Sequence, residues 1–311
     1  MKKTLLIILT ISIVLNLILA YYIWLGNLGK PSNVKEANQN YSYLSKRIFA
    51  EDQNDLLINF INLRTPLRQY VGSQKDKIGV YFEYLPSGTS IGVNDQLEVP
   101  IVSLVKVPII MAVYEQIEKG FIKKDQVLTI KEENIDKKFG TLWKKGEGTK
   151  ITVEKAIRLS LIESDNTASS LLLSLVPGSI DRVFDSLDIP KETENKYHVI
   201  SPKNYSSIFR SLYLSSYLSR QSSNEILDIL TQTIFNDKIA AGVPQEIRTA
   251  HKIGVLNSAD SLVTIYSDCG IVYVPRRPYA LCIFVEGDEE KAREYMQFIS
   301  KMAYSYMIAV K

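Results

Sequence analysis

The chain has 311 residues, of which 46% are hydrophobic and 23% are charged, a composition that allows a full core and excludes global disorder. The 37 basic and 34 acidic residues leave a formal net charge of +3, a balance that does not suggest binding to nucleic acid. The length suits one α/β-type unit of about 250 residues with short appendages.

The first predicted element is a membrane anchor at the N-terminus. Lys2 and Lys3 precede a charge-free run over 4–29, and its residues 5–25 are almost wholly apolar. About 20 such residues span a bilayer. We therefore predict a single-pass signal anchor over 1–29, with the N-terminus in the cytoplasm.

A cleaved signal peptide is the alternative for this segment, because the two lysines form an n-region and Ala20 could precede a cleavage site. Aromatic residues of the kind found at membrane interfaces favour the uncleaved anchor: Tyr21, Tyr22 and Trp24. A polar tether is predicted over 30–50 and a folded domain over 51–311. The protein is thus predicted in the cell membrane, with its domain outside the cytoplasm.

Helical and strand patterns follow in an order that frames this domain. The helical patterns cover 43–70 with a break at Thr65 and Pro66, then 109–117, 152–162, 167–175, 179–187, 202–219, 223–234 and 288–309. The strand patterns cover 77–84, 90–97, 248–254, 262–274 and 279–286. Residues 121–150 are polar and rich in lysine, and we expect long, mobile loops there. Two terminal helices and five strands therefore bracket a helical insert.

The pattern on which the functional prediction depends lies at the start of this insert. Ser103 opens an apolar helical segment, and Lys106 follows on the same helical face. An apolar setting lowers the pKa of a lysine, and a neutral lysine can accept a serine proton. The sequence therefore predicts a nucleophile with its base. The alternative is a capping serine and a solvated lysine, and the same pattern at Ser32 and Lys35 in the linker has no functional meaning.

Two further polar groups stand in the same frame. Ser164, Asp165 and Asn166 lie at a break between helices, and Lys252 precedes Gly254 on a strand after the insert. Each is weak alone, since a helix cap explains the first, and an edge-strand lysine with a bulge explains the second. Their order is more specific: Ser-x-x-Lys at a helix start, Ser-Asp-Asn between helices, Lys-x-Gly on a strand.

With these motifs in this order, the chain resembles the class A β-lactamase family, within the wider group of penicillin-recognising serine enzymes. The resemblance extends over roughly residues 51–311 and includes Ser103-Leu-Val-Lys-Val-Pro108, Ser164-Asp-Asn-Thr-Ala168 and His251-Lys-Ile-Gly254. It implies an α+β fold in which the terminal helices flank a five-stranded antiparallel sheet. An all-helical subdomain, about 103–245, would lie beside the sheet, with the active site between the two.

The resemblance also implies catalytic roles. Ser103 would attack the substrate carbonyl, and Lys106 would help to remove its proton. Ser164 would relay a proton to the leaving nitrogen. Lys252 would orient Ser164 and attract the substrate carboxylate as a point charge.

Substrate-binding roles follow from the same resemblance. Asn166 would hold the substrate amide, and Gly254 would belong to the substrate-binding strand. The backbone N–H groups of Ser103 and Val255 would form the oxyanion hole.

The sequence departs from the family pattern in two places. The family's deacylating glutamate stands in a Glu-x-x-Leu-Asn setting, which residues 184–202 lack, so the loop there is predicted to be shortened. Glu192 and Glu194 are interpreted as solvated charges, and deacylation is therefore expected to be slow. Ile253 replaces the usual hydroxyl residue between Lys and Gly, which should weaken carboxylate recognition by on the order of 1–3 kcal/mol.

Histidine and cysteine are too scarce for a zinc hydrolase, because the chain has only His198, His251, Cys269 and Cys282. We expect neither a metal nor another cofactor. A Ser-His-Asp triad with His251 is conceivable, but no aspartate is marked for it. The two cysteines fall on successive strands and could form a disulfide outside the cell, although two buried free thiols are the interpretation we favour.

These observations predict a monomeric, membrane-anchored serine hydrolase that forms a Ser103 acyl-enzyme with β-lactams and hydrolyses their amide bond. One alternative is a peptidase acting on the acyl-D-alanyl-D-alanine ends of cell-wall peptides. Another is a penicillin-binding or wall-sensing protein that acylates once and stops. The missing glutamate favours the alternatives, and the family likeness favours the β-lactamase.

Overall fold

The structure is a computed structural model that describes residues 42–43, 59–194, 197–256 and 264–310. The predicted anchor over 1–29 lies outside the described residues, as does the tether over 30–50 except for Ser42 and Tyr43. No helix within the described ranges is both long enough and apolar enough to cross a bilayer. Apart from Ser42, the described residues belong to one compact unit.

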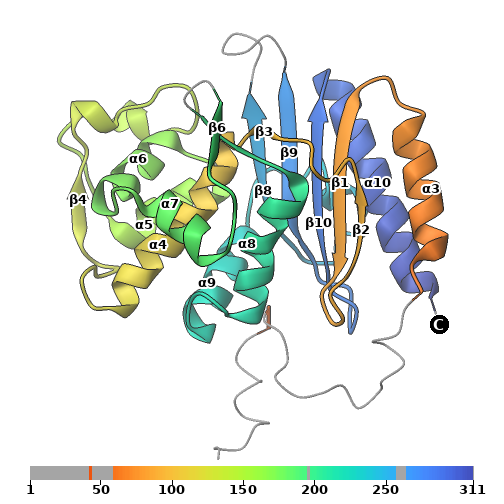
Figure 1. The fold of residues 1–311 in the computed structure, drawn as a ribbon. Coiled ribbons are helices and arrows are strands. Elements are labelled where there is room, and N and C mark those ends of the chain that lie inside the picture. Colours follow the sequence, from red (N-terminus) through yellow and green to blue (C-terminus); the bar gives the residue numbers. More distant parts are fainter. Residues whose placement is uncertain (1–41, 44–58, 195–196, 257–263, 311) are drawn as a thin grey trace, which may run out of the picture. The chain divides into compact units, whose positions relative to one another are not determined.

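A five-stranded antiparallel sheet lies at the centre of this unit, in the strand order β2-β1-β10-β9-β8 (Figure 1). Its strands are β1 (Lys77–Tyr84), β2 (Thr89–Val93), β8 (Thr249–Leu256), β9 (Ile265–Val272) and β10 (Tyr279–Glu286). β1, β8, β9 and β10 are buried at nearly every position, as in a sheet covered on both faces. The predicted five-stranded sheet is confirmed.

The second strand is shorter than predicted. It ends at Val93 because Asn94 has a left-handed backbone, with φ of 48°, and turns the chain away from the sheet. The Asn94 side chain donates a hydrogen bond of 2.9 Å to the carbonyl of Ile78, which fixes this turn against β1.

One face of the sheet is covered by α3 (Ile61–Gly72) and α10 (Glu289–Ala309), as Figure 1 shows. The predicted break at Thr65 and Pro66 is wrong, since α3 continues through Pro66. A proline inside a helix costs about 3 kcal/mol. Three side chains of the same helix are buried: Leu63, Leu67 and Val71. Each stabilises the fold by roughly 1.5–3 kcal/mol when fully buried. Packing therefore outweighs the proline.

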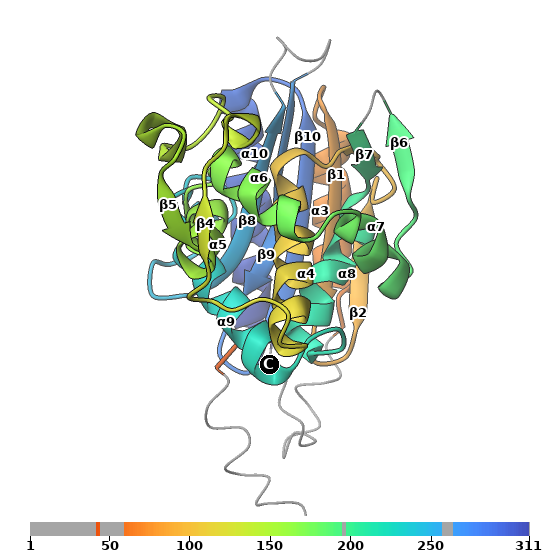
Figure 2. The same ribbon diagram turned by 90° about the vertical axis from the view of Figure 1, so that its left-hand side faces the viewer.

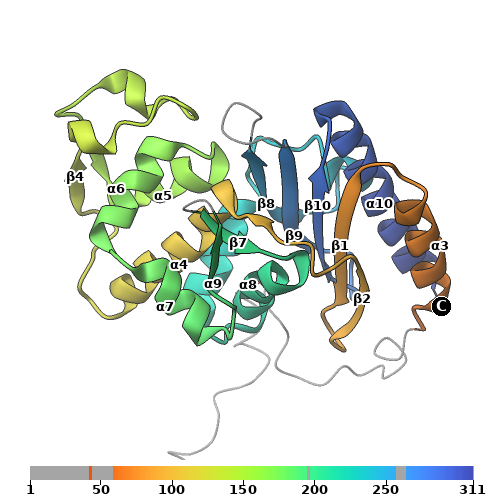
Figure 3. The same ribbon diagram turned by 45° about the horizontal axis from the view of Figure 1, so that its top comes forward.

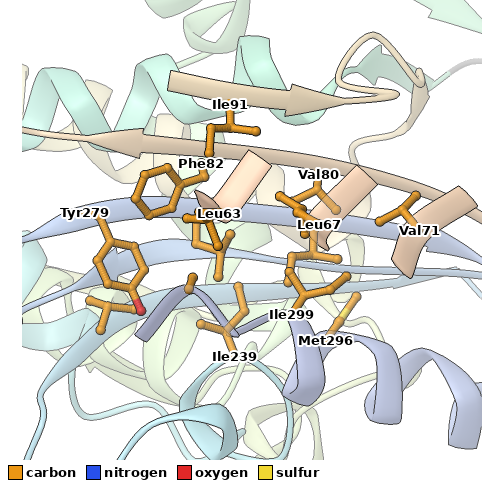
Figure 4. Packing of buried hydrophobic residues seen from close by; sticks show 14 of the residues in the cluster. Leu63, Leu67, Val71, Val80, Phe82, Ile91, Ile239, Tyr279, Met296 and Ile299 are labelled. Atoms are coloured by element: carbon orange, nitrogen blue, oxygen red, sulfur yellow. The ribbon is translucent and has the colours of Figure 1, made fainter. Parts of the chain in front are cut away.

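The main hydrophobic core lies between these two helices and the sheet (Figure 4). Alternate residues of β1 point to this side, as the two-residue period of a strand requires. The helices contribute the facing side chains. Labelled members of the core include Leu63, Leu67, Val71, Val80, Phe82, Met296 and Ile299.

The other face carries the predicted helical insert, in which helices surround α4 (Figures 2 and 3). They are α4 (Lys106–Glu118), α5 (Val153–Ile162), α6 (Asn166–Leu175), α7 (Ser179–Ser186), α8 (Pro202–Leu214) and α9 (Arg220–Leu230). α4 is buried at every position over 106–114, so it is a core helix and not a surface helix. α8 packs directly on the sheet. The predicted α+β fold, with its helical subdomain, is confirmed.

Short elements interrupt the segments that the sequence treats as loops. They are β3 (Val99–Pro100), η2 (Val102–Val105), β4 (Val127–Thr129), η3 (Glu132–Asn134), η4 (Leu142–Lys145), β5 (Lys150–Thr152), β6 (Glu192–Glu194), β7 (Tyr197–Ile200) and η5 (Ala240–Gly242). β4 pairs with β5, and β7 pairs with both β3 and β6. The predicted long loops over 121–150 are therefore interrupted by β4, η3, η4 and the start of β5. The sequence does not show these elements because strands of three residues are too short to show a period.

Cys269 and Cys282 lie directly opposite each other on β9 and β10, with a Cα–Cα distance of 4.1 Å. They form a disulfide. The possibility of a disulfide between successive strands is confirmed, and the favoured interpretation of two buried free thiols is wrong. Antiparallel register places the two side chains on the same face of the sheet, within reach of each other.

Candidate active site

Ser103 lies in η2, the single turn that leads into α4. The preceding residue, Val102, has φ of 40°, which is a strained conformation for a β-branched residue. The turn is held from both sides: the Ile101 N–H donates to the carbonyl of His198 at 2.8 Å, and the Tyr205 hydroxyl donates to the carbonyl of Leu104 at 2.9 Å. The backbone around Ser103 is therefore fixed in one unusual geometry.

The Lys106 Nζ lies within hydrogen-bond distance of four oxygens: Ser103 Oγ at 3.0 Å, Ser164 Oγ at 3.0 Å, the Ser164 carbonyl at 2.6 Å and Asn166 Oδ1 at 2.7 Å. The carbonyl oxygens can only accept, whereas the hydroxyls can also donate. A neutral amine would satisfy both carbonyls with its two N–H groups and keep its lone pair for a serine hydroxyl. The predicted meeting of Ser103 and Lys106 is thus present in the structure.

Burial of Lys106 lowers the pKa of its amine from 10.5 to about 8. The negative charges of Asp165 and Asp136 act in the opposite direction and limit the shift. An amine with this pKa is neutral in a useful fraction of molecules near neutral pH, as a general base must be.

Ser164 stands between the two lysines of the site. Its hydroxyl accepts a hydrogen bond of 2.8 Å from Lys252 Nζ and lies 3.0 Å from Lys106 Nζ. Its backbone is left-handed, with φ of 54°. The Lys252 side chain is fully buried, and its pKa lies well below the ordinary value because of this burial and of the positive charge of Lys106. Ser103, Lys106, Ser164 and Lys252 therefore form one continuous chain of hydrogen-bonding groups.

Asp165 supports this arrangement, although the sequence assigns it no role beyond a possible helix cap. Its Oδ1 accepts from the Ala168 N–H at 2.9 Å and caps α6, while its Oδ2 accepts from the N–H groups of Thr141 and Leu142, both at 2.7 Å. Gly140, with φ of 89°, makes room for this carboxylate, because a Cβ there would overlap it. Asp165 thereby joins the loop before η4 to the segment that carries Ser164 and Asn166.

Strand β8 brings Gly254 and Val255 next to the nucleophile turn. A Cβ on Gly254 would lie 3.2 Å from Leu104 Cγ and 3.4 Å from Val102 Cγ2, so a glycine lets the strand approach the turn closely. The half-buried Val255 follows it on the strand. This places the backbone of Val255 on a segment adjoining that of Ser103.

Ile253, the residue that departs from the family pattern, is 5% exposed on the same strand. Its carbonyl accepts a hydrogen bond of 3.2 Å from Lys252 Nζ. The expectation that Ile253, in place of a hydroxyl residue, weakens the recognition of the substrate carboxylate stays a prediction.

Within the described ranges, no carboxylate hydrogen-bonds to Ser103 or forms an ion pair with Lys106 or Lys252. Glu192 is exposed on β6, which agrees with its interpretation as a solvated charge. The hydrogen-bonding partners of the nucleophile and its base are therefore neutral oxygens.

His251 does have an aspartate partner, which the sequence did not mark. Its Nδ1 lies 2.8 Å from Asp268 Oδ1, and both side chains are fully buried. Asp268 also accepts from the Ile239 N–H at 3.0 Å. The partner of the Ser103 hydroxyl, however, is Lys106, so the geometry favours the Ser-Lys arrangement over a Ser-His-Asp triad.

Two phenylalanines that the sequence did not single out also border the site. The Phe139 carbonyl accepts from the Asn166 N–H at 3.1 Å, and Lys252 Nζ lies over the ring of Phe235, 5.9 Å from its centroid. For Phe139, the only indication in the sequence is an isolated aromatic residue in a lysine-rich segment. No sequence pattern places Phe235, since its position comes from the packing of the segment after α9.

This fold, with a serine hydroxyl beside a buried lysine, is that of a serine hydrolase. The model of the β-lactamase enzyme family matches residues 62–307. The chain belongs to this family, and the resemblance to class A β-lactamases stated from the motifs is confirmed.

Individual relatives are distant but cover most of the chain. A β-lactamase of Bacteroides uniformis is 25% identical over 276 residues, covering 79% of this chain and 91% of that protein. The β-lactamase VEB-1 of Pseudomonas aeruginosa is 23% identical over 263 residues, covering 78% and 88%. The solved structure of PBP-A superposes with a TM-score of 0.73 at 23% identity, covering 80% of this chain and 96% of that one. This last likeness supports the fold alone.

Proposed function

We propose that the protein is a β-lactamase in which Ser103 forms the acyl-enzyme and Lys106 is the base. The observation that carries this proposal is the 3.0 Å hydrogen bond between Lys106 Nζ and Ser103 Oγ, in a buried setting that lowers the lysine pKa to about 8. The β-lactamase-type hydrolase activity follows from the family, whereas the residue roles are the proposal.

Acylation would begin with proton transfer from Ser103 Oγ to neutral Lys106 as the oxygen attacks the β-lactam carbonyl. The N–H groups of Ser103 and Val255 would stabilise the oxyanion. Ser164 would donate its proton to the departing ring nitrogen and regain one from Lys106, since the two groups are 3.0 Å apart. A C–O bond forms and the C–N bond breaks. The Ser164 proton ends on nitrogen, and the Ser103 proton replaces it on Ser164 by way of Lys106, which is neutral again.

Lys252 and Asn166 would bind the substrate during this step. Lys252 would attract the carboxylate, and the Asn166 amide would bond to the acyl side chain. Asn166 Oδ1 already accepts from Lys106 at 2.7 Å, so its Nδ2 can donate to a substrate carbonyl.

A second candidate function is acylation by β-lactams without their efficient hydrolysis. It is favoured by one observation: the described partners of Ser103 and Lys106 include no carboxylate that could activate a water. In that case the protein would act as a penicillin-binding sensor, or as a peptidase on acyl-D-alanyl-D-alanine ends.

We also propose that the protein is a monomer held in the cell membrane by its N-terminal segment, with the catalytic domain outside the cytoplasm. The apolar run over 5–25 supports this location. The disulfide between Cys269 and Cys282 supports it independently, because disulfides persist in oxidising compartments. Protease shaving of intact cells should remove the domain, and a domain protected from protease would contradict the location.

The test of the activity is to incubate the full chain, purified in detergent, with a penicillin and to follow its intact mass and the free drug over time. A transient Ser103 adduct with accumulating hydrolysed drug is the expected result. A stable adduct would overturn the proposed β-lactamase function and favour the second candidate function. A wild-type chain with neither adduct nor hydrolysis would overturn both, and Ser103→Ala should lose the adduct entirely.

A further inference from the structure

The residue proposed to bind the substrate carboxylate is closed to solvent. Lys252 is 0% exposed, and its Nζ donates to Ser164 Oγ at 2.8 Å and to the Ile253 carbonyl at 3.2 Å. The same Nζ lies over the ring of Phe235, 5.9 Å from the ring centroid. A carboxylate therefore has no open approach to Lys252 in this conformation.

Phe235 belongs to an aromatic pair contributed by two separate segments. Its ring centroid lies 5.7 Å from that of Phe139, with an interplanar angle of 44°. Phe139 comes from the loop between η3 and η4 and is 40% exposed, whereas Phe235 follows α9 and is half-buried. Two apolar rings thus meet beside Lys252, in a site whose other groups are lysines, serines and an amide.

Both segments are tied to the catalytic region. The Phe139 carbonyl accepts from the N–H of Asn166, and the N–H of Ile234, beside Phe235, donates to the carbonyl of Ile162 at 3.3 Å. These bonds hold the two backbones. The Phe235 side chain itself has no polar atom, and its ring contacts Phe139 and Lys252. A rotation of this side chain uncovers Lys252 without breaking a hydrogen bond.

We propose that Phe235, packed against Phe139, is a gate over Lys252 that an anionic substrate opens by displacing the ring. A ring face attracts an ammonium ion, but an oppositely charged carboxylate with direct hydrogen bonds attracts it more strongly. The gate therefore closes Lys252 to water when the site is empty and yields to a carboxylate. The carboxylate part of the inference rests on the proposed function, whereas the covering of Lys252 by the ring does not.

The first test measures the cover directly, by brief treatment of the full chain with acetic anhydride and peptide mapping of Lys252. The wild-type lysine should be protected, and Phe235→Ala should raise its acetylation about tenfold, a gain expected when a buried amine becomes accessible. Phe298→Ala is the matched control: Phe298 is 47% exposed and stacks on Tyr70 in another part of the fold. Equal labelling of Lys252 in wild type and Phe235→Ala would overturn the gate.

The second test measures acylation by a penicillin as a function of drug concentration. Removing the ring should lower the half-saturating concentration about fivefold, in line with a cation–π contact of about 1 kcal/mol, and leave the limiting rate unchanged. Phe139→Ala should change it in the same direction by less. A half-saturating concentration that rises in Phe235→Ala would contradict the gate, because the ring would then assist binding.

The two tests separate the gate from the proposed function. Increased labelling of Lys252 with no acylation of any variant would retain the gate and overturn the acyl-enzyme. Phe235→Leu, which keeps an apolar side chain without a ring face, serves if the alanine variant fails to fold. Lys252 should be acetylated more in Phe235→Leu than in wild type. Equal protection of Lys252 in the two proteins would contradict a role for the ring.

Discussion

At Lys106, burial and charge act in opposite directions on one amine. Burial removes water from the ammonium and lowers its pKa, while Asp165 and Asp136 favour the charged form and raise it. The balance falls at about 8, so the neutral form increases as the pH rises towards that value. If neutral Lys106 is the base, the acylation rate must follow the same curve.

We therefore expect the second-order rate of acylation to rise about tenfold per pH unit below the Lys106 pKa and to level off above it. Stopped-flow measurements with a penicillin between pH 6 and 10 would record this profile. Lys106→Arg should abolish acylation at every pH, because a guanidinium stays charged. A rate that falls from pH 6 to 8 would exclude a neutral lysine as the base.

Asp165 is the second residue whose effect can be measured alone. Asp165→Ala leaves the N–H groups of Thr141, Leu142 and Ala168 without their acceptor, and we expect the free energy of unfolding to fall by about 3–5 kcal/mol. Urea denaturation at pH 7 would measure it. Asp288→Ala is the control, because this exposed cap of α10 should cost only about 1 kcal/mol. Equal losses would mean that Asp165 is an ordinary cap.

At the scale of elements, the proposed oxyanion hole requires that β8 and the turn carrying Ser103 lie close together. Gly254→Ala places a methyl group 3.2 Å from Leu104 Cγ, which is tighter than ordinary contact. The overpacking should separate the strand and the turn slightly and lower the acylation rate about tenfold, equivalent to roughly 1–2 kcal/mol. Gly72→Ala at the end of α3 is the control, since a Cβ there meets nothing within 4 Å. An unchanged acylation rate for Gly254→Ala would show that catalysis does not depend on the close approach of β8 to the turn.

Elements with a clear period or a clear cap could be predicted from the sequence. β1 spans 77–84 as expected, and Thr152 caps α5 by accepting from the Lys155 N–H at 3.2 Å. These two features depend on local chemistry or on a period along the chain. The prediction that Ser103, Ser164 and Lys252 share one site came instead from the family resemblance that the three motifs carry, and their hydrogen bonds agree with it.

Other elements depend on contacts that no local pattern contains. α3 continues through Pro66 because its apolar face packs on the sheet, and the three-residue β6 exists only because β7 lies beside it. The left-handed backbones of Val102 and Ser164 run against the preferences of their residue types, so only the surrounding fold can impose them. For the same reason, the position of Phe235 over Lys252 was beyond prediction.

At the scale of the whole molecule, the compact unit begins earlier than the predicted domain start at residue 51. Tyr43 is 4% exposed, its N–H donates to Asn224 Oδ1 at 3.2 Å, and its carbonyl accepts from the Tyr273 hydroxyl at 3.1 Å. Its hydroxyl also accepts from Arg248. A residue of the predicted tether is therefore packed into the domain.

Tyr43→Ala should consequently lower the free energy of unfolding by about 2–4 kcal/mol, as expected for the loss of a buried aromatic side chain. Thermal or urea denaturation of the full chain would show the change. Tyr43→Phe keeps the ring against Tyr273 and loses only the hydroxyl, so its effect should be about 1 kcal/mol. If the alanine variant matched wild type, Tyr43 would contribute nothing to the unit.

The disulfide connects the central strands of the same unit next to the site, because Cys269 lies opposite Lys252 on β8 as well as opposite Cys282 on β10. The cross-link joins residues 13 apart, so chain entropy limits its contribution to about 3 kcal/mol. The double variant Cys269→Ala/Cys282→Ala should be less stable by about 1–3 kcal/mol in urea denaturation. Its acylation rate should stay within about twofold of wild type, since the pairing of Lys252 with its neighbour on β9 persists without the sulfurs.

The control for the disulfide is a reductant, which should lower the stability of the wild-type chain and leave that of the double variant unchanged. A variant that retains its stability but loses acylation would instead assign the disulfide to the positioning of Lys252.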